Sequence, residues 1–167
     1  PWGRPDMSPF LFADAILNNK PIKVFNHGDM MRDFTYVDDI VEGVIRVSDK
    51  IATPESGKTA PYRIFNIGNH QPEQLMDFIG LMEQAFGKVA EKEFLPMQPG
   101  DVKATYADTQ ALEDWVGFKP NTNLELGIKK FVQWYKKYFL KRLSIEIFFP
   151  IPPTLCKARS EEHTSEL

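Results

Sequence analysis

Arg32 is the side chain whose type and surroundings most clearly suggest chemistry. It follows the turn Gly28-Asp29 and precedes two acidic residues, Asp38 and Asp39, in the run GDMMRDFTYVDD. A guanidinium presents planar, paired donors that fit an anion such as a phosphate, but a loop arginine can also be a solvated charge. Asp38 and Asp39 are expected in the first turn of a helix, where the helix dipole favours carboxylates.

A second polar group lies in the proline- and glycine-rich run PMQPGD, which contains Gln98 and Asp101. Such a run predicts a loop. A carboxylate in a loop can accept hydrogen bonds from the hydroxyls of a ligand, or from its own backbone in a turn. His27 and His70 are isolated and lack the spacing of metal ligands, so we expect no metal site.

The composition predicts one packed domain. The chain has 167 residues, of which 43% are hydrophobic and 13% aromatic. Its net charge of −3 argues against a nucleic-acid-binding protein, and no apolar run is long enough for a membrane helix. The single cysteine, Cys156, cannot form a disulfide within the chain. A reducing compartment fits this, and we expect a cytoplasmic protein.

Hydrophobic periodicity predicts alternating helices and strands, and therefore an α/β fold. Helices are expected at 6–19, 37–48, 72–86 and 124–138, with a short one that begins at Asp108 or Thr109 and ends at 116. Strands are expected at 21–25, 33–36, 62–68 and 91–95. The sequence has no G-x-G-x-x-G motif and no phosphate-binding loop, so we expect no autonomous dinucleotide site.

The two ends of the sequence differ from its body. The start, PWGRP, has neither a helix cap nor a preceding strand, so we expect the chain to be cut from a larger protein. After Arg142 the hydrophobic period is lost, and the run RSEEHTSEL from Arg159 to Leu167 resembles a translated sequencing adapter. We therefore expect residues 1–142 to form the functional region and 143–167 to be a non-native tail.

Several motifs then occur in a fixed order: PWGRPDM, PIKVFN, RDFTYVDDI, FNIG, PGD and YAD. The motifs lie between residues 1 and 108, and the match as a whole covers about residues 1–138. The ordered set resembles the C-terminal half of the extended short-chain dehydrogenase/reductases that act on nucleotide sugars, the NAD-dependent epimerase/dehydratase family. The GRPDM run and the MQPGDV-x-ATYAD run are similar to the UDP-glucuronate 4-epimerase branch of that family.

The resemblance implies a Rossmann-type N-terminal half that binds NAD and carries a catalytic Tyr-x-x-x-Lys pair. Neither that pair nor the glycine fingerprint occurs in these residues. The chain alone is therefore expected to be inactive, with no catalytic residue and no cofactor-binding residue of its own. The resemblance also implies a homodimer formed through the missing half.

The resemblance gives four residues roles in binding the nucleotide. Arg32 would bind the pyrophosphate of a UDP-sugar, and Asp101 would accept hydrogen bonds from the ribose hydroxyls. Val24 and Phe25 match the strand edge that holds the uracil, through backbone hydrogen bonds and ring packing. The Phe25 side chain could equally be a core residue.

Two further positions are less determined. Arg4 could meet the sugar carboxylate or a phosphate, or could be a loose terminal charge. Gln98 lies in the loop that the family uses on the ribose and phosphates. Related galactose epimerases have an arginine at that position, which puts a phosphate role for Gln98 in doubt.

The resemblance thus implies the substrate-binding half of an NAD-dependent nucleotide-sugar 4-epimerase. The intact enzyme would interconvert UDP-glucuronate and UDP-galacturonate through a 4-keto intermediate. Two alternatives remain: a dehydratase or decarboxylase of the same superfamily, and a nucleotide-sugar-binding module without catalysis. The nucleotide sugar that the whole protein turns over distinguishes an epimerase from a dehydratase or decarboxylase. A glycine fingerprint and a Tyr-x-x-x-Lys pair upstream of Pro1 would distinguish an enzyme from a binding module.

Overall fold

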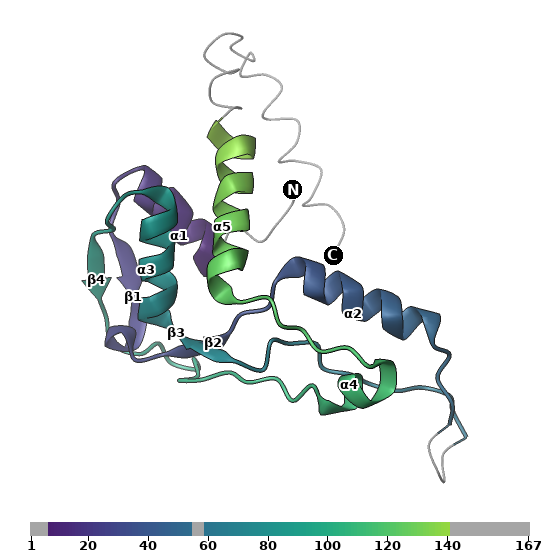
Figure 1. Cartoon of the computed structure of the whole chain (residues 1–167). Coiled ribbons are helices and arrows are strands. Elements are labelled where there is room, and N and C mark those ends of the chain that lie inside the picture. The colour runs from purple at the N-terminus through teal and green to yellow at the C-terminus, as the bar shows by residue number, and fades with distance from the viewer. Residues whose placement is uncertain (1–6, 55–58, 141–167) are drawn as a thin grey trace, which may run out of the picture. The chain divides into compact units, whose positions relative to one another are not determined.

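The computed structural model describes residues 7–54 and 59–140 of the chain (Figure 1). It divides into two units, Pro1–Val132 and Gln133–Leu167. The tail at 143–167, predicted to be non-native, lies outside the described residues, and so does Arg4, a candidate substrate-binding residue. Within the described ranges, no helix has both the length and the apolar character needed to cross a membrane.

Helices and short strands alternate along the first unit, as the sequence predicted. In chain order the elements are α1 (Ser8–Leu17), β1 (Ile22–Val24), the 3-10 turn η1 (Phe25–Gly28), β2 (Met31–Asp33), α2 (Val37–Asp49), β3 (Pro72–Gln74), α3 (Leu75–Phe86), β4 (Lys92–Phe94), α4 (Gln110–Val116) and α5 (Leu124–Tyr135). The strands form two separate pairs: β1 runs parallel to β4, and β2 runs antiparallel to β3.

The core lies where α1 and α3 pack beside the β1–β4 pair (Figure 1). Ile16 of α1 and Ile79 and Met82 of α3 are almost completely buried. The ring of Phe78 contacts the ring of Phe12 at a centroid distance of 5.9 Å. Burial of side chains of this size stabilises the fold by about 1.5–3 kcal/mol each, so this layer dominates the stability of the unit.

Two strand predictions differ from the structure. The strand expected at 33–36 begins two residues earlier, because β2 takes its register from β3, with Arg32 opposite Glu73. The segment 62–68 is not a strand. A strand is defined by a hydrogen-bonded neighbour, and the alternating pattern of the sequence cannot supply one.

The predicted start of the helix at Pro72 is also wrong. Pro72–Gln74 forms β3, and α3 begins at Leu75, whose N–H donates to the carbonyl of Met30. The predicted end is confirmed, because Gly87 adopts a left-handed conformation (φ 72°) and its N–H bonds to the carbonyl of Glu83.

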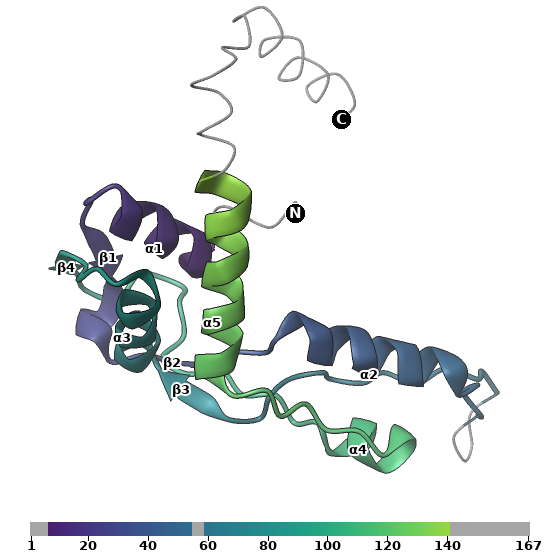
Figure 2. The same cartoon turned by 45° about the horizontal axis from the view of Figure 1, so that its top comes forward.

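Helix α2 packs beside α4, and the two lie side by side in both views (Figure 1, Figure 2). Its boundaries agree with the prediction within one residue. The described part of the second unit continues α5 as a π-helical turn, η2 (Lys136–Leu140), where the sequence predicted a helix to 138. Aromatic rings one turn apart stack there, Trp134 on Tyr138 at 5.7 Å and Tyr135 on Phe139 at 4.5 Å.

Candidate functional site

Arg32 lies in the middle of β2, and its guanidinium donates three hydrogen bonds. Its Nη2 donates to Oδ1 of Asp101 at 2.9 Å, across 69 residues of sequence. Its Nη1 donates to the carbonyl of Met31 at 2.8 Å and to that of Lys103 at 3.3 Å. Since a guanidinium has five N–H donors, these three bonds to described residues leave two. The side chain remains 25% exposed, so Arg32 is a positioned cation that an anion can reach.

Asp101 sits at a tight turn in the loop that follows β4. Gly100 before it has a φ of 83°, which a residue with a side chain adopts only under strain. Its Oδ1 accepts from its neighbour Val102 N–H at 2.8 Å as well as from Arg32. The carboxylate therefore plays the turn role and also pairs with Arg32. Gln98 closes the same turn, because its carbonyl accepts from Asp101 N–H at 3.2 Å, while its side chain is exposed.

Val24 and Phe25 lie at the end of β1. Val24 is completely buried, and its carbonyl accepts from Leu95 N–H at 2.9 Å, so β4 occupies this strand edge. Phe25 is half-buried. Among the described residues, no hydrogen bond or ion pair joins either of them to Arg32. The structure thus joins Arg32 and Asp101 directly, brings Gln98 to Asp101, and keeps Val24 and Phe25 in a separate group.

Asp38 and Asp39 lie in the first turn of α2, as predicted, but neither caps the helix. Asp39 instead accepts from both the N–H and the hydroxyl of Thr122, each at 2.9 Å. Asp38 faces Lys130 at 3.5 Å and is largely exposed. Their roles are structural, because neither touches Arg32 or Asp101.

The sequence alone assigns no role to Asp33, the residue after Arg32. Its Oδ2 accepts from the N–H of His70 at 3.0 Å and from that of Ala107 at 3.1 Å. The pattern does contain a signal, since alternate residues of a strand face opposite sides. A carboxylate beside Arg32 on a short strand therefore points away from the guanidinium and toward other backbone.

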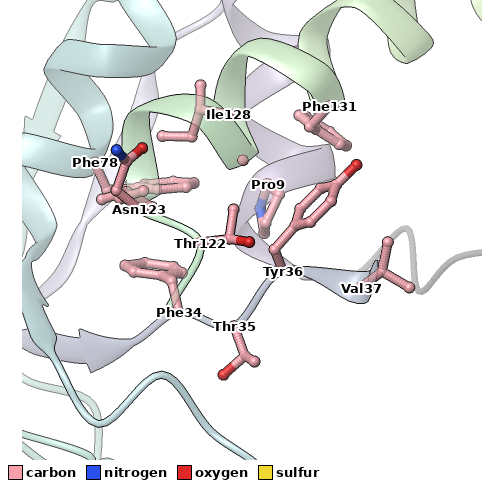
Figure 3. Close-up of a pocket in the computed structure, with 12 residues that line it drawn as sticks. Pro9, Phe34, Thr35, Tyr36, Val37, Phe78, Thr122, Asn123, Ile128 and Phe131 are labelled. Atoms are coloured by element: carbon pink, nitrogen blue, oxygen red, sulfur yellow. The ribbon is translucent and has the colours of Figure 1, made fainter. Parts of the chain in front are cut away.

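An apolar cavity of about 230 Å³ lies next to the segment that follows β2. Figure 3 shows Phe34 and Phe78 on one side of it and Tyr36 and Phe131 on the other. Phe34 and Phe78 stack at 4.6 Å. The lining carries no charged side chain, so this cavity is a poor site for a diphosphate, which needs cationic partners. In the part of the chain that the structure describes, no cluster of acidic, histidine or cysteine side chains could hold a metal ion.

Known proteins match this chain over most of its length. Residues 3–68 match the profile of the NAD dependent epimerase/dehydratase family. Protein CapI of Staphylococcus aureus is 47% identical over 84% of this chain, and a probable UDP-glucuronate 4-epimerase of Rhizobium meliloti is 43% identical over 83%. The chain therefore contains a domain of the NAD dependent epimerase/dehydratase family. The α/β class predicted from the sequence is confirmed.

A solved member of this epimerase/dehydratase family has the same fold over the matched region. The crystal structure of UDP-glucuronic acid 4-epimerase from Bacillus cereus, in complex with UDP-glucuronic acid and NAD, superposes with a TM-score of 0.72 at 29% identity. The matched region covers 83% of this chain and 42% of the Bacillus cereus chain. The chain likewise spans 45% of the length of CapI and 44% of the Rhizobium meliloti protein. It therefore corresponds to less than half of these relatives.

Proposed function

We propose that this chain is the substrate-binding C-terminal part of an NAD-dependent UDP-glucuronate 4-epimerase. The whole protein would interconvert UDP-glucuronate and UDP-galacturonate through a 4-keto intermediate. The observation that carries the proposal is Arg32, a guanidinium fixed by Asp101 and two carbonyls yet still open to solvent. The identity to proteins named UDP-glucuronate 4-epimerase supports it.

Arg32 would bind the diphosphate of the UDP-sugar through its two remaining donors. Asp101 would hold Arg32 in place and offer its carboxylate to the ribose hydroxyls, and Gln98 would keep that turn closed. Val24 and Phe25 would support the uracil, and Arg4 would meet the sugar carboxylate or a phosphate. A fixed cation costs less conformational entropy on binding than a free arginine side chain, so the grip on the diphosphate can persist while the sugar turns.

NAD would supply hydride acceptance and return at C4 of the sugar in the whole protein. The residues of this chain do not fit that group, because the sequence has no glycine fingerprint and no Tyr-x-x-x-Lys pair. We therefore assign binding and orientation to this chain and no step of the hydride transfer. We further propose that the catalytic pair and the dimer contact belong to the upstream part, and that the protein is cytoplasmic.

Helix α2 supports the existence of that upstream part. Its apolar side is half or more exposed, at Val37, Val41, Val44 and Ile45. Its other side packs inward, with Gly43 against Ile67. An exposed apolar surface of this kind is typical of a site that another protein element covers. We propose that the remaining length, more than half of the relatives, covers this side of α2.

The experiment that tests the site is Arg32→Ala in the whole protein. UDP affinity should fall about 100-fold, the loss of a charge-assisted diphosphate contact, and turnover of UDP-glucuronate should fall with it. Lys103→Ala is the matched control, since it removes one positive charge from the adjacent loop, where the Lys103 side chain is 63% exposed and its ammonium pairs with Asp29. Calorimetry with UDP and product analysis measure both. Unchanged affinity in Arg32→Ala would refute the proposal, and turnover of a different nucleotide sugar would correct the substrate.

A further inference from the structure

We infer that Asp33 is a positioning residue for Arg32. Its carboxylate would clamp two loops against β2 and so hold the segment that carries Asp101 in reach of the guanidinium. The inference rests on the proposed function in one respect, the identification of the diphosphate as the group that Arg32 binds. The clamp itself rests on the geometry around β2.

The segment 101–107 runs beside β2 and is held from both faces of the strand. On one face Arg32 bonds to the side chain of Asp101 and to the carbonyl of Lys103. On the other, Asp33 N–H donates to the hydroxyl of Thr105 at 3.1 Å, and Asp33 Oδ2 accepts from Ala107 N–H at 3.1 Å. Backbone bonds between Met31 and the stretch 103–105 join the two groups. The position of Asp101 is thus fixed by a series of hydrogen bonds between β2 and residues 101–107, and the bond from Ala107 to Asp33 is the last of them.

A second loop meets the same carboxylate oxygen. The N–H of His70 donates to Asp33 Oδ2 at 3.0 Å. A Cβ added at Gly68 would lie 2.4 Å from the Cβ of Ala107 and 3.0 Å from Asp33 Oδ2, so only glycine permits this approach. Neighbouring Asn69 N–H donates to the hydroxyl of Thr35 at 3.2 Å. Loss of the Asp33 carboxylate would leave two backbone N–H groups from two different loops without their acceptor.

The first test measures the clamp without any ligand. In the 167-residue chain, Asp33→Ala should raise the amide hydrogen-exchange rates of His70 and Ala107 about tenfold or more, because a charge-assisted acceptor is lost. Asp33→Asn should raise them less, because the amide oxygen still accepts. Asp29→Asn is the matched control: it removes the same charge from an exposed carboxylate, 62% accessible, that pairs with Lys103. The exchange rate of Met82, in the core, reports whether each variant is folded. Unchanged rates at His70 and Ala107 would overturn the inference.

The second test asks whether Asp33 acts through Arg32. In the whole protein, Asp33→Ala should lower UDP affinity about tenfold, and Asp33→Asn should recover part of that loss. In an Arg32→Ala background, Asp33→Ala should have little further effect, whereas a general structural defect would lower affinity equally in both backgrounds. An equal loss in both backgrounds would overturn the positioning role. If Arg32→Ala alone left UDP affinity unchanged, the proposed function would fail, and the exchange rates would still decide the clamp.

Discussion

Helices α2 and α3 are both amphipathic, yet they present their apolar sides to different surroundings. On α3, the apolar residues Phe78, Ile79 and Met82 are 2% exposed or less. On α2, Val41, Val44 and Ile45 are each 50% exposed. The difference lies in the available neighbours, since α3 packs on α1 whereas α2 packs on α4.

The side of α2 that faces the rest of the unit combines polar and small residues with two half-buried apolar residues, Ile40 and Val47. Asp39 bonds to Thr122, Gly43 packs against Ile67, and the guanidinium of Arg46 lies 5.0 Å from the ring centre of Phe118. A helix normally gains most of its stability by burying its apolar side. The apolar residues of α3 are thus covered within the described part of the chain. Helix α2 is held in part by polar contacts, and its exposed apolar residues Val41, Val44 and Ile45 are available to a further element.

The largest expected effect is on the α3 side of the comparison. Ile79→Ala should lower the free energy of unfolding of the chain by about 2–4 kcal/mol, because it leaves a cavity in a fully buried layer. Val44→Ala on α2 should change it by less than about 0.5 kcal/mol. Urea denaturation followed by circular dichroism measures both.

Equal losses for Ile79→Ala and Val44→Ala would show that the apolar side of α2 is already buried in the chain. The comparison is sharpened by Val44→Lys, measured in the chain and in the whole protein. We expect little change in the chain. In the whole protein we expect a loss of several kcal/mol, because the upstream part would bury the ammonium without a partner.

A medium effect is expected on the polar side of α2. Asp39→Ala should destabilise the chain by about 1–2 kcal/mol, because two hydrogen bonds to Thr122 are lost. Asp38→Ala is the matched control, since this neighbouring carboxylate makes one long contact with Lys130 and its side chain is 67% exposed. It should cost less than about 0.5 kcal/mol. If both variants lost the same stability, polar contacts would not be what holds α2.

The smallest expected effect is a pH dependence at the end of α3. Burial by itself would raise the pKa of Glu83, but hydrogen bonds from Lys92 and from Ala90 N–H, together with the Lys92 charge, lower it further than burial raises it. The ionised Glu83 therefore stabilises the folded chain above the ordinary carboxyl pKa of 4.5. This contribution fades as the pH falls below that value through the lowered folded pKa.

Glu83→Gln should accordingly reduce the loss of stability between pH 7 and pH 4, measured as the shift in urea midpoint. Glu42→Gln on α2 serves as the control, because Glu42 pairs with Arg46 one turn away on an exposed surface. It should change the urea midpoint at pH 7 by little, because exposed ion pairs of this kind contribute little to stability. A steeper acid loss in Glu83→Gln would mean that the sign assigned to this group is wrong.

Local features of this protein can be predicted from its sequence alone. The apolar period placed α1 and α2 closely, Gly87 marked the end of α3, and the ordered motifs identified the family. Arg32, Asp101 and Gln98 could be selected as candidates from residue type and loop composition. Helical period, turn chemistry and motif order depend on neighbours in sequence, so a single sequence contains them.

The contacts between distant segments, in contrast, became known from the three-dimensional structure. It joined Arg32 to Asp101 across 69 residues, showed that Asp33 accepts hydrogen bonds from two loops, and placed the start of β2 two residues earlier than predicted, paired with β3. It also showed that residues 62–68 do not form a strand and that the apolar side of α2 is exposed. Pairing and burial require a specific partner at a specific place, and the period of one segment contains no information about which partner that is.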